Sequence, residues 1–329
     1  MSRKINKCLA INRLKTCFFF AHWINRAFKW ALSVSLSLRM KTAGFSIVRN
    51  ALKYDYPVVE SIRSVLPLVD AFYVGVGQSE DNTLELIKGL NEPKIHVIET
   101  VWDDDLRTGG QVLAIETNKI FDSIPAEFDW CFYIQADEVV HEKDYNEIQK
   151  QMLLYVENKQ VEGLLFRYVH FYGTYDYVGD SRIWYRNEIR IVRNDKNIRS
   201  YKDAQGFRKK DDSKLTVKAI DASIYHYGWV KHPAKQKEKE KNFHKMWHDD
   251  AWMKENVKEE DEFNYSKIDS LKKFTGTHPA IMLERIAAKN WNFEYDPAKA
   301  KVKFKNRVLM IIEKVTGKRL FEYRNYRKI

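Results

Sequence analysis

The chain begins with short apolar runs that alternate with segments whose apolar residues recur every three or four positions. The runs predict strands at residues 44–48, 71–76, 95–99 and 130–134, and the last of them is typical of a strand buried on both faces. The intervening segments, which predict helices, cover residues 58–66, 84–90 and 111–121. In the first of them, Val58, Ile62 and Val65 fall on one face. This alternation predicts an α/β fold with a mainly parallel mixed sheet and helices on both faces.

The pattern changes after Gly163. Further strands are expected at residues 164–170, 188–192 and 215–220, between loops rich in Tyr, Trp, Arg and Asp, and a short apolar strand is expected at residues 222–225, directly before His226. After Trp229 the sequence becomes helical and charged, with helices expected at residues 235–245, 281–288 and 308–315. Lys and Glu alternate in the first of these, which indicates a solvated helix face. We therefore expect a basic N-terminal extension over residues 1–40, an α/β domain over 41–230 and a helical C-terminal region over 231–329.

The net charge of +11 is concentrated in one segment of the 329 residues. Residues 1–40 hold eight Lys and Arg and no Asp or Glu, which leaves +3 for the other 289 residues. A basic surface over the main body is therefore not expected, and this argues against nucleic acid as a partner. Three cysteines, Cys8, Cys17 and Cys131, are too few for a disulfide framework and fit a reducing compartment.

Two interpretations of the N-terminal extension remain open. Residues 17–38 are rich in Phe, Trp and Leu, but Arg26 and Lys29 interrupt them before they reach the length of a membrane span. Basic residues interleaved with aromatic ones suit a helix that lies on an anionic membrane surface. Alternatively, the extension is poorly ordered, or lies upstream of a natural start at Met40, which directly precedes the first strand.

The fourth predicted strand ends abruptly in carboxylates, at Asp137 and Glu138. In open α/β sheets, ligands bind at the carboxyl ends of the strands. A carboxylate there is suited to hold Mg²⁺ or Mn²⁺ against a phosphorylated substrate, because such ions prefer oxygen ligands. The alternative interpretation is a solvated acidic loop.

Several short motifs in this order resemble family 2 glycosyltransferases, which have the GT-A (nucleotide-diphospho-sugar transferase) fold. Arg49-Asn50 follows the first strand, residues 79–83 with Asp81 follow the second, and Ala136-Asp137-Glu138 follows the fourth. With Gln135 in front, the last motif reads Gln-Ala-Asp-Glu, and in this it resembles a bacterial subgroup of the family. The resemblance extends to about Trp229 and includes His170-Phe171-Tyr172-Gly173, Glu188-Ile189-Arg190 and His226-Tyr227-Gly228-Trp229.

The resemblance implies a metal-assisted enzyme that transfers a sugar from a nucleotide-sugar donor to an acceptor hydroxyl with inversion. Asp137 matches the family's ligand for Mg²⁺ or Mn²⁺. Glu138 is expected to orient that ligand, or else to cap a following helix. The donor is expected near Arg49, Asn50, Asp81, Glu138 and His226. A structural role is the alternative for His226, and for His170 it is the favoured interpretation because Tyr and Phe surround it.

An inverting transfer also needs a general base for the acceptor proton. Asp203 is the first candidate and Glu188 the second. Alternatively, they form ion pairs with Arg208 and Arg190. The sequence departs from the family where Gln135 replaces an acid of the metal motif, and where 76–78 lacks the usual Asp that contacts the nucleoside. We therefore expect weaker metal binding that relies on the donor's phosphates, and an unassigned donor base.

The expected partners are a nucleotide-sugar donor and a glycan or lipid-linked acceptor in cell-surface glycan synthesis. We expect a cytoplasmic protein with peripheral contact at the inner face of the membrane through its basic extension. A nucleotidyltransferase and a catalytically silent GT-A-like binding protein are the alternatives. The donor sugar, the linkage and the oligomeric state are not specified by the sequence.

Overall fold

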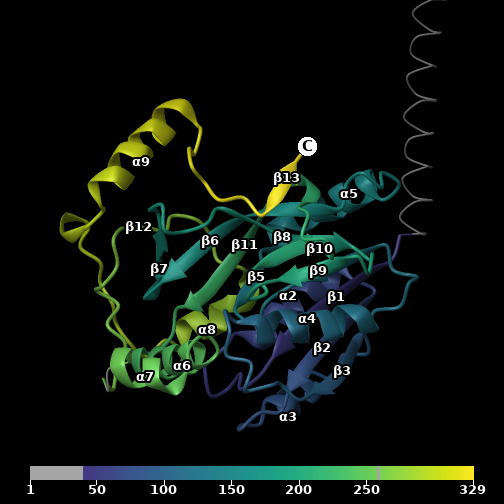
Figure 1. The fold of residues 1–329 in the computed structure, drawn as a ribbon, viewed down its shortest axis with the longest axis horizontal. Coiled ribbons are helices and arrows are strands. Elements are labelled where there is room, and N and C mark those ends of the chain that lie inside the picture. Colours follow the sequence, from purple (N-terminus) through teal and green to yellow (C-terminus); the bar gives the residue numbers. More distant parts are fainter. Residues whose placement is uncertain (1–39, 258–259) are drawn as a thin grey trace, which may run out of the picture. The chain divides into compact units, whose positions relative to one another are not determined.

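Four parallel strands in the order β3-β2-β1-β4 form the first half of the sheet in this computed structural model, which describes residues 40–257 and 260–329 (Figure 1). The strands are β1 (Thr42–Val48), β2 (Ala71–Gly77), β3 (Ile95–Thr100) and β4 (Trp130–Tyr133). The connecting helices are α2 (Val58–Val65), continued by a 3₁₀ turn (Leu66–Leu68), α3 (Thr83–Lys88) and α4 (Gln111–Ser123). Each predicted element of this half is present within two residues of its expected bounds.

Helices cover both faces of these strands. Neighbouring side chains in β1 point to opposite faces of the sheet, and all of them are buried. The ring of Phe45 packs on Phe121 of α4, with centroids 5.5 Å apart. On the other face, Thr42 Oγ1 lies 3.9 Å from the sulfur of Met152 in α5 (Tyr145–Tyr155), a helix that the sequence did not predict. The predicted α/β class is confirmed, and the strand and helix order agrees with that implied by the GT-A resemblance.

The second half of the sheet is mixed. β8 (Asn187–Arg193) runs antiparallel to β4 and to β6 (Gly163–Tyr172), and β6 runs parallel to β11 (Leu215–Trp229). The remaining strands of this sheet are β5 (Glu138–Val140), β7 (Thr174–Gly179), β12 (Leu271–Lys273) and β13 (Tyr326–Lys328). A separate hairpin consists of β9 (Ile198–Tyr201) and β10 (Gly206–Lys209). β11 joins the parts of this half, because it pairs with β5 and β6 on its two sides.

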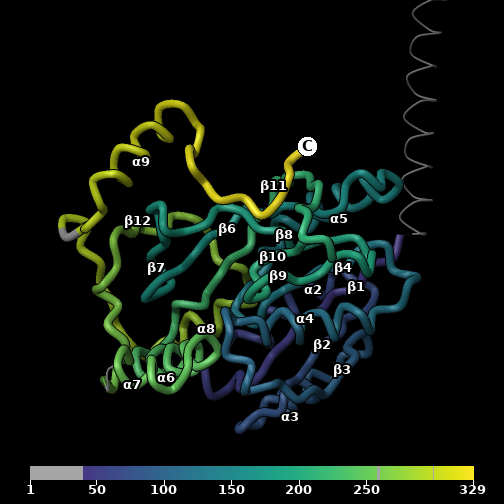
Figure 2. Tube along the Cα trace, viewed as in Figure 1, coloured from purple at the N-terminus to yellow at the C-terminus, as the bar shows by residue number. Residues whose placement is uncertain are grey.

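Residues 231–329 contain the expected helices but are not purely helical (Figure 2). The helices are α6 (Pro233–Lys245), α7 (Asp250–Asn256), α8 (Leu283–Ala287) and α9 (Phe304–Thr316), with 3₁₀ turns at Ala280–Met282 and Pro297–Lys299. A further 3₁₀ turn, at Glu142–Asp144, precedes α5. β12 pairs with β7, and β13 pairs with β11, so this region also extends the sheet. The proposed division at residue 230 stays a prediction.

The N-terminal extension was predicted over residues 1–40, of which residues 1–39 lie outside the described part of the chain. Among the helices that the structure does describe, none has the length and apolar character needed to cross a membrane.

Candidate functional site

The loops after β1 and β2 are tied together by the predicted residues Asn50 and Asp81. Asn50 has a positive φ of 56°, and its Oδ1 accepts a hydrogen bond from the backbone of Glu80 at 2.7 Å. Asp81 Oδ2 accepts from the backbone N–H of Lys53 at 2.7 Å, while its Oδ1 accepts from that of Thr83 at 3.0 Å. Both side chains therefore shape the carboxyl edge of the parallel strands by joining its loops.

Arg49 extends this network to the loop after β3. Its Nε donates to the carbonyl oxygen of Gln78 at 2.9 Å, and a second nitrogen donates to Asp104 Oδ2 at 3.0 Å. The guanidinium also lies 5.8 Å from the ring centroid of Trp102. Three of the predicted donor-binding residues thus lie on adjacent loops at one edge of the sheet, where the resemblance places the donor.

Asp137 follows β4 at the same edge and is held by a lysine from α6. The Asp137 side chain is largely buried, and its Oδ2 lies 3.0 Å from Nζ of Lys239. Lys239 also donates to the carbonyl oxygen of Gly228 at 3.0 Å. Burial by itself would raise the pKa of Asp137, but the nearby basic groups together, with Lys239 the foremost among them, outweigh it and hold that pKa well below its usual range. Asp137 is therefore an ionised carboxylate, and its burial beside Lys239 excludes the solvated-loop interpretation.

A second histidine fixes the proton position on His226. Nε2 of His170 lies 2.9 Å from the carbonyl oxygen of Tyr185, which only accepts, so this nitrogen carries the proton. Burial lowers the pKa of His170 to about 3, so its Nδ1 is unprotonated. His226 Nδ1, 3.3 Å away, must then donate to it. Burial also lowers the pKa of His226, which leaves its Nε2 as a free lone pair 3.7 Å from Asp137 Oδ1.

The pairing of β11 with its two neighbours explains why these side chains meet. In the sheet register, His226 lies opposite His170 of β6 on one side and opposite Glu138 of β5 on the other. Gly228, two residues further along β11, leaves the necessary space. A Cβ atom there would lie 2.6 Å from His226 Nε2 and 2.7 Å from Asp137 Oδ2, so a larger residue would have to displace one of them.

Glu138 begins strand β5 and caps no helix, so that alternative is wrong. Its side chain is fully buried, with Oε1 and Oε2 bound to Arg190 at 2.7 and 2.8 Å. Tyr168 donates to Oε1 at 2.6 Å, and the backbone of Gln135 donates to Oε2 at 3.1 Å. The carboxylate thus fixes the Gln135–Asp137 loop against β6 and β8, a supporting position directly behind Asp137.

Asp203 lies in a loop that contacts the Asp137 loop. Gln135 Nε2 donates to the carbonyl oxygen of Ala204 at 3.2 Å. The alternative pairing with Arg208 does not form, because Arg208 binds Asp212 and Asn325 instead. Burial raises the pKa of Asp203, which moves this carboxyl toward the range in which a general base operates.

Glu188, the second candidate, is more deeply buried. Its expected partner Arg190 binds Glu138 instead, and Glu188 Oε1 accepts a bond of 3.1 Å from Gln205. Its Oε2 is buried without a hydrogen-bond partner. Burial raises the pKa of Glu188 to about 8, so it is largely protonated at neutral pH. Its position suits a structural acid better than a base that must reach an acceptor.

Two lysines of the site were missed by the sequence analysis. Lys239 lies in the helix interpreted as solvated, and Lys231 is fully buried just after the His226–Trp229 motif. Lys231 Nζ donates to the carbonyl oxygen of Tyr54 at 2.8 Å. The ring centroid of Tyr56 lies 4.6 Å from Lys231 Nζ and 4.9 Å from Lys239 Nζ. The only hint in the sequence was the closeness of Lys231 to the histidine motif.

Across residues 40–257 and 260–329, no group of three or more His, Cys, Asp and Glu side chains is arranged to hold a metal ion. Asp137 and His226 offer two ligand atoms for a metal ion, an ionised carboxylate oxygen and a free imidazole nitrogen. Two protein ligands suit an ion that also binds substrate phosphates and water. The residues therefore fit a divalent cation that arrives with a phosphorylated donor.

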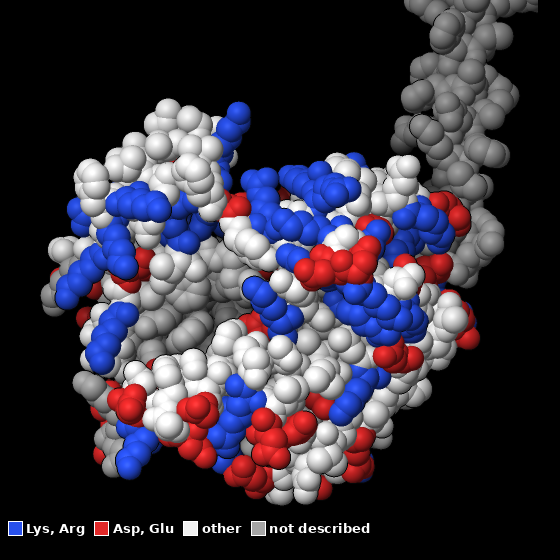
Figure 3. Space-filling view, in the orientation of Figure 1, with Lys and Arg blue, Asp and Glu red and all other residues white. Residues whose placement is uncertain are grey.

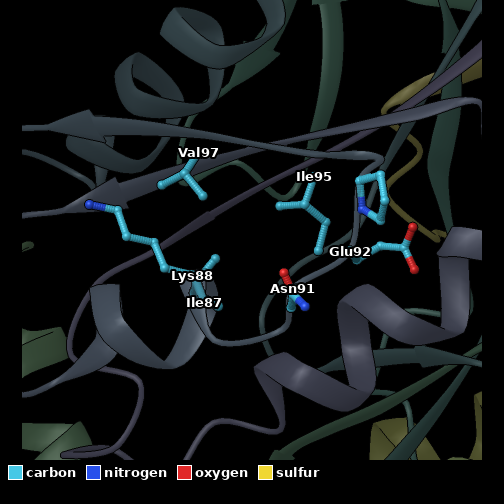
Figure 4. Close-up of a pocket in the computed structure, with 7 residues that line it drawn as sticks. Ile87, Lys88, Asn91, Glu92, Ile95 and Val97 are labelled. Carbon is cyan, nitrogen blue, oxygen red and sulfur yellow. The ribbon is translucent and has the colours of Figure 1, made fainter.

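A pocket beside the edge strand β3 has no part in this site. It lies between α3 and β3, where Lys88, Glu92 and Ile95 are among its lining residues (Figure 4). None of the predicted site residues lines it.

No model of a known protein family matches the chain, and no curated protein matches it. Among solved structures, it is similar to S. aureus TarS with 15% identity and a TM-score of 0.33, over 68% of this chain but only 41% of TarS. Glucosyl-3-phosphoglycerate synthase from Mycobacterium tuberculosis, in complex with Mn²⁺, UDP and phosphoglyceric acid, has 15% identity and a TM-score of 0.28 over 42% of this chain and 45% of that one. The inositol-1-phosphate CTP transferase from T. maritima has 14% identity and a TM-score of 0.35 over 67% and 98%. Similarity this low leaves the function to the residues of the site.

Proposed function

We propose that this chain is a glycosyltransferase that takes a sugar from a nucleotide-sugar donor. The observation that supports this most is the ionised carboxylate of Asp137 at the carboxyl edge of the parallel strands, where the loops bearing Arg49, Asn50 and Asp81 also lie. Ligands of open α/β sheets bind at this edge. This shared position supports the proposal that Asp137, Arg49, Asn50 and Asp81 bind the donor.

The charges around Asp137 suit the diphosphate of such a donor. Lys239 Nζ is in direct contact with Asp137, and the guanidinium of Arg49 lies on a neighbouring loop. During transfer, negative charge grows on the leaving nucleoside diphosphate, and fixed positive groups near it lower the barrier. We assign Lys239 and Arg49 to this stabilisation.

Asp137 and His226 would hold Mg²⁺ or Mn²⁺, with the donor's phosphates as further ligands. A cation there supplies Lewis-acid stabilisation of the leaving diphosphate. Glu138 and His170 keep these two metal ligands oriented, because Glu138 fixes the loop of Asp137 and His170 fixes the proton on His226. Lys239 binds the same carboxylate, so the ammonium group and a divalent cation compete for Asp137.

The proposed transfer is an inverting displacement with Asp203 as general base. The acceptor hydroxyl oxygen forms a bond to the anomeric carbon as the bond from that carbon to the diphosphate oxygen breaks. The hydroxyl proton passes to Asp203, and the electron pair leaves with the nucleoside diphosphate. A glycan or lipid-linked acceptor stays a prediction, as does the placement of this activity at the inner face of the membrane.

The test is product analysis with purified protein, UDP-, GDP- and CDP-sugars, and Mn²⁺. Release of a nucleoside diphosphate supports the proposal, whereas release of pyrophosphate in a parallel reaction with a nucleoside triphosphate and a sugar phosphate would establish the nucleotidyltransferase alternative. Asp137→Asn should abolish turnover, and Asp221→Asn, at an exposed carboxylate outside the site, is the matched control. Donor binding without turnover, unaffected by Asp137→Asn, would favour the silent binding protein.

A further inference from the structure

Helix α9 carries a row of apolar side chains that point into solvent. Phe304, Val308, Ile311 and Val315 are 82%, 40%, 64% and 80% exposed. They are separated by four, three and four residues, so they form one continuous stripe along the helix. Of the 15 strongly exposed large apolar side chains in the described residues, eight lie from Phe304 onward. The exposure is therefore concentrated in one segment and is not scattered over the surface.

The opposite face of α9 is fixed to the rest of the protein. Glu313 is 7% exposed and pairs with Arg182 at 3.0 Å and with Arg186 at 2.6 Å. At about 100° per residue, Glu313 lies about opposite Phe304 on the helix. These ion pairs hold α9 with its apolar stripe facing away from its anchor, and Figure 1 shows the helix clear of the sheet.

The charges around the stripe are almost all positive. Residues 301–318 contain Lys301, Lys303, Lys305, Arg307, Lys314 and Lys318, and the one acid among them is Glu313, which is already paired. Lys and Arg side chains gather around this helix in Figure 3. The segment after α9 adds one more exposed apolar side chain, Phe321, which is 89% exposed; the acid next to it, Glu322, is paired with Arg319 and Arg324.

We propose that α9 is a peripheral membrane anchor that lies in the plane of an anionic lipid surface. Its apolar stripe would enter the acyl boundary while the flanking lysines and arginines bind lipid phosphates. Long basic side chains extend from such a position to the headgroups. With 13 residues, or about 20 Å, α9 is too short to span a bilayer and suits an interfacial position. A second copy of this chain fits the stripe less well than a lipid surface does, because pairing two α9 stripes would bring their flanking lysines and arginines together.

This anchor is distinct from the membrane contact predicted for residues 1–39, and it does not rest on the proposed transferase activity. The test is sedimentation of the full chain with vesicles of phosphatidylcholine plus phosphatidylglycerol, compared with phosphatidylcholine alone. Ile311→Ser combined with Val315→Ser should weaken binding to the anionic vesicles about tenfold or more. The matched control combines Val101→Ser with Leu154→Ser, which are 70% and 61% exposed elsewhere on the surface, and should bind as the unchanged chain does.

Hydrogen exchange separates α9 from the N-terminal segment in the same full-length protein. Anionic vesicles should slow exchange in peptides covering residues 304–323, and vesicles of phosphatidylcholine alone should not. The proposal is overturned if exchange there is unchanged while the protein is bound, or if the two double variants bind equally well. Concentration-dependent dimerisation of the lipid-free protein that the α9 variant abolishes would instead assign the stripe to a second copy.

Discussion

The ammonium nitrogen of Lys239 lies 3.0 Å from Oδ2 of Asp137, although 102 residues separate them in the chain. The contact brings α6 over the end of β4 and gives Asp137 a cationic partner that belongs to the protein. Because Gln135 replaces an acid of the family's metal motif, Asp137 is the carboxylate left to balance Lys239. The two form an electrically neutral pair. The metal dependence of the proposed site is therefore decided by competition between Lys239 and a divalent cation.

Replacing Lys239 with Met should strengthen Mn²⁺ binding. The variant keeps much of the side-chain volume but frees Asp137 Oδ2, so we expect about tenfold tighter binding, equivalent to about 1.4 kcal/mol. Electron paramagnetic resonance of free Mn²⁺ measures this without any turnover. Lys235→Met, on the same helix but paired with Glu238, is the control and should leave the affinity unchanged. Equal Mn²⁺ binding by the two variants would show that Asp137 is no cation ligand.

Replacing Glu138 with Gln should destabilise the fold strongly. Arg190 is fully buried, and the substitution removes the charge that balances it. Breaking a buried ion pair from one side costs about 3–5 kcal/mol. Urea unfolding should show this loss, whereas Asp221→Asn, which breaks an exposed pair with Arg167, should cost about 1 kcal/mol or less. A small effect at Glu138 would mean that the pair is not part of the folded state.

The first half of the fold was predictable because β1, β2 and β4 are buried almost throughout and appear as apolar runs, while the edge strand β3 keeps Ile95, Val97 and Ile98. The later strands were harder to predict. β11 has 15 residues, but Lys218 and Asp221 interrupt its apolar pattern, so the sequence predicted two separate pieces, residues 215–220 and 222–225, in place of one long strand. β5 has three residues, too few to show any period.

The candidate site residues that directly follow strands were predictable from the sequence. The contacts between residues far apart in the chain were not. Asp137 was found because an acid follows a buried strand. Glu188 and Arg190, two residues apart in β8, suggested an ion pair, yet Arg190 binds Glu138, 52 residues away. Likewise, a helix in which Lys and Glu alternate does not reveal that Lys239 faces the sheet. Such pairings are set by the sheet register, which local sequence does not specify.

Glu188→Gln should stabilise the protein at alkaline pH and not at acid pH. The folded-state pKa is about 8, and the usual value is about 4.3, so the folded state binds more protons between these values. The stability from this group is thus fully present below about pH 4.3 and is lost as the pH rises through about 8. Gln mimics the neutral acid, so the variant should gain a few kcal/mol, on the order of 1.4 per pKa unit, at about pH 9 and almost nothing at about pH 4.

Chemical denaturation at several pH values measures the effect at Glu188. Glu127→Gln, at an exposed carboxylate, is the control and should show no such pH dependence. If the difference in unfolding free energy between the variant and the unchanged chain is the same at about pH 4 and about pH 9, Glu188 is ionised in the folded protein.

Asp203→Asn should remove the acid limb of the pH–rate profile if Asp203 takes the acceptor proton. A base works only when deprotonated, so kcat/KM should fall as the pH drops through the pKa of Asp203, which burial raises above its usual value. The variant should lose about 10²–10⁴-fold in kcat/KM. Asp211→Asn, on an exposed carboxylate of the next loop, should keep both the rate and the limb. Should Glu188→Gln abolish turnover while Asp203→Asn does not, the base would be Glu188, and the unchanged chain would show a limb near its pKa of about 8.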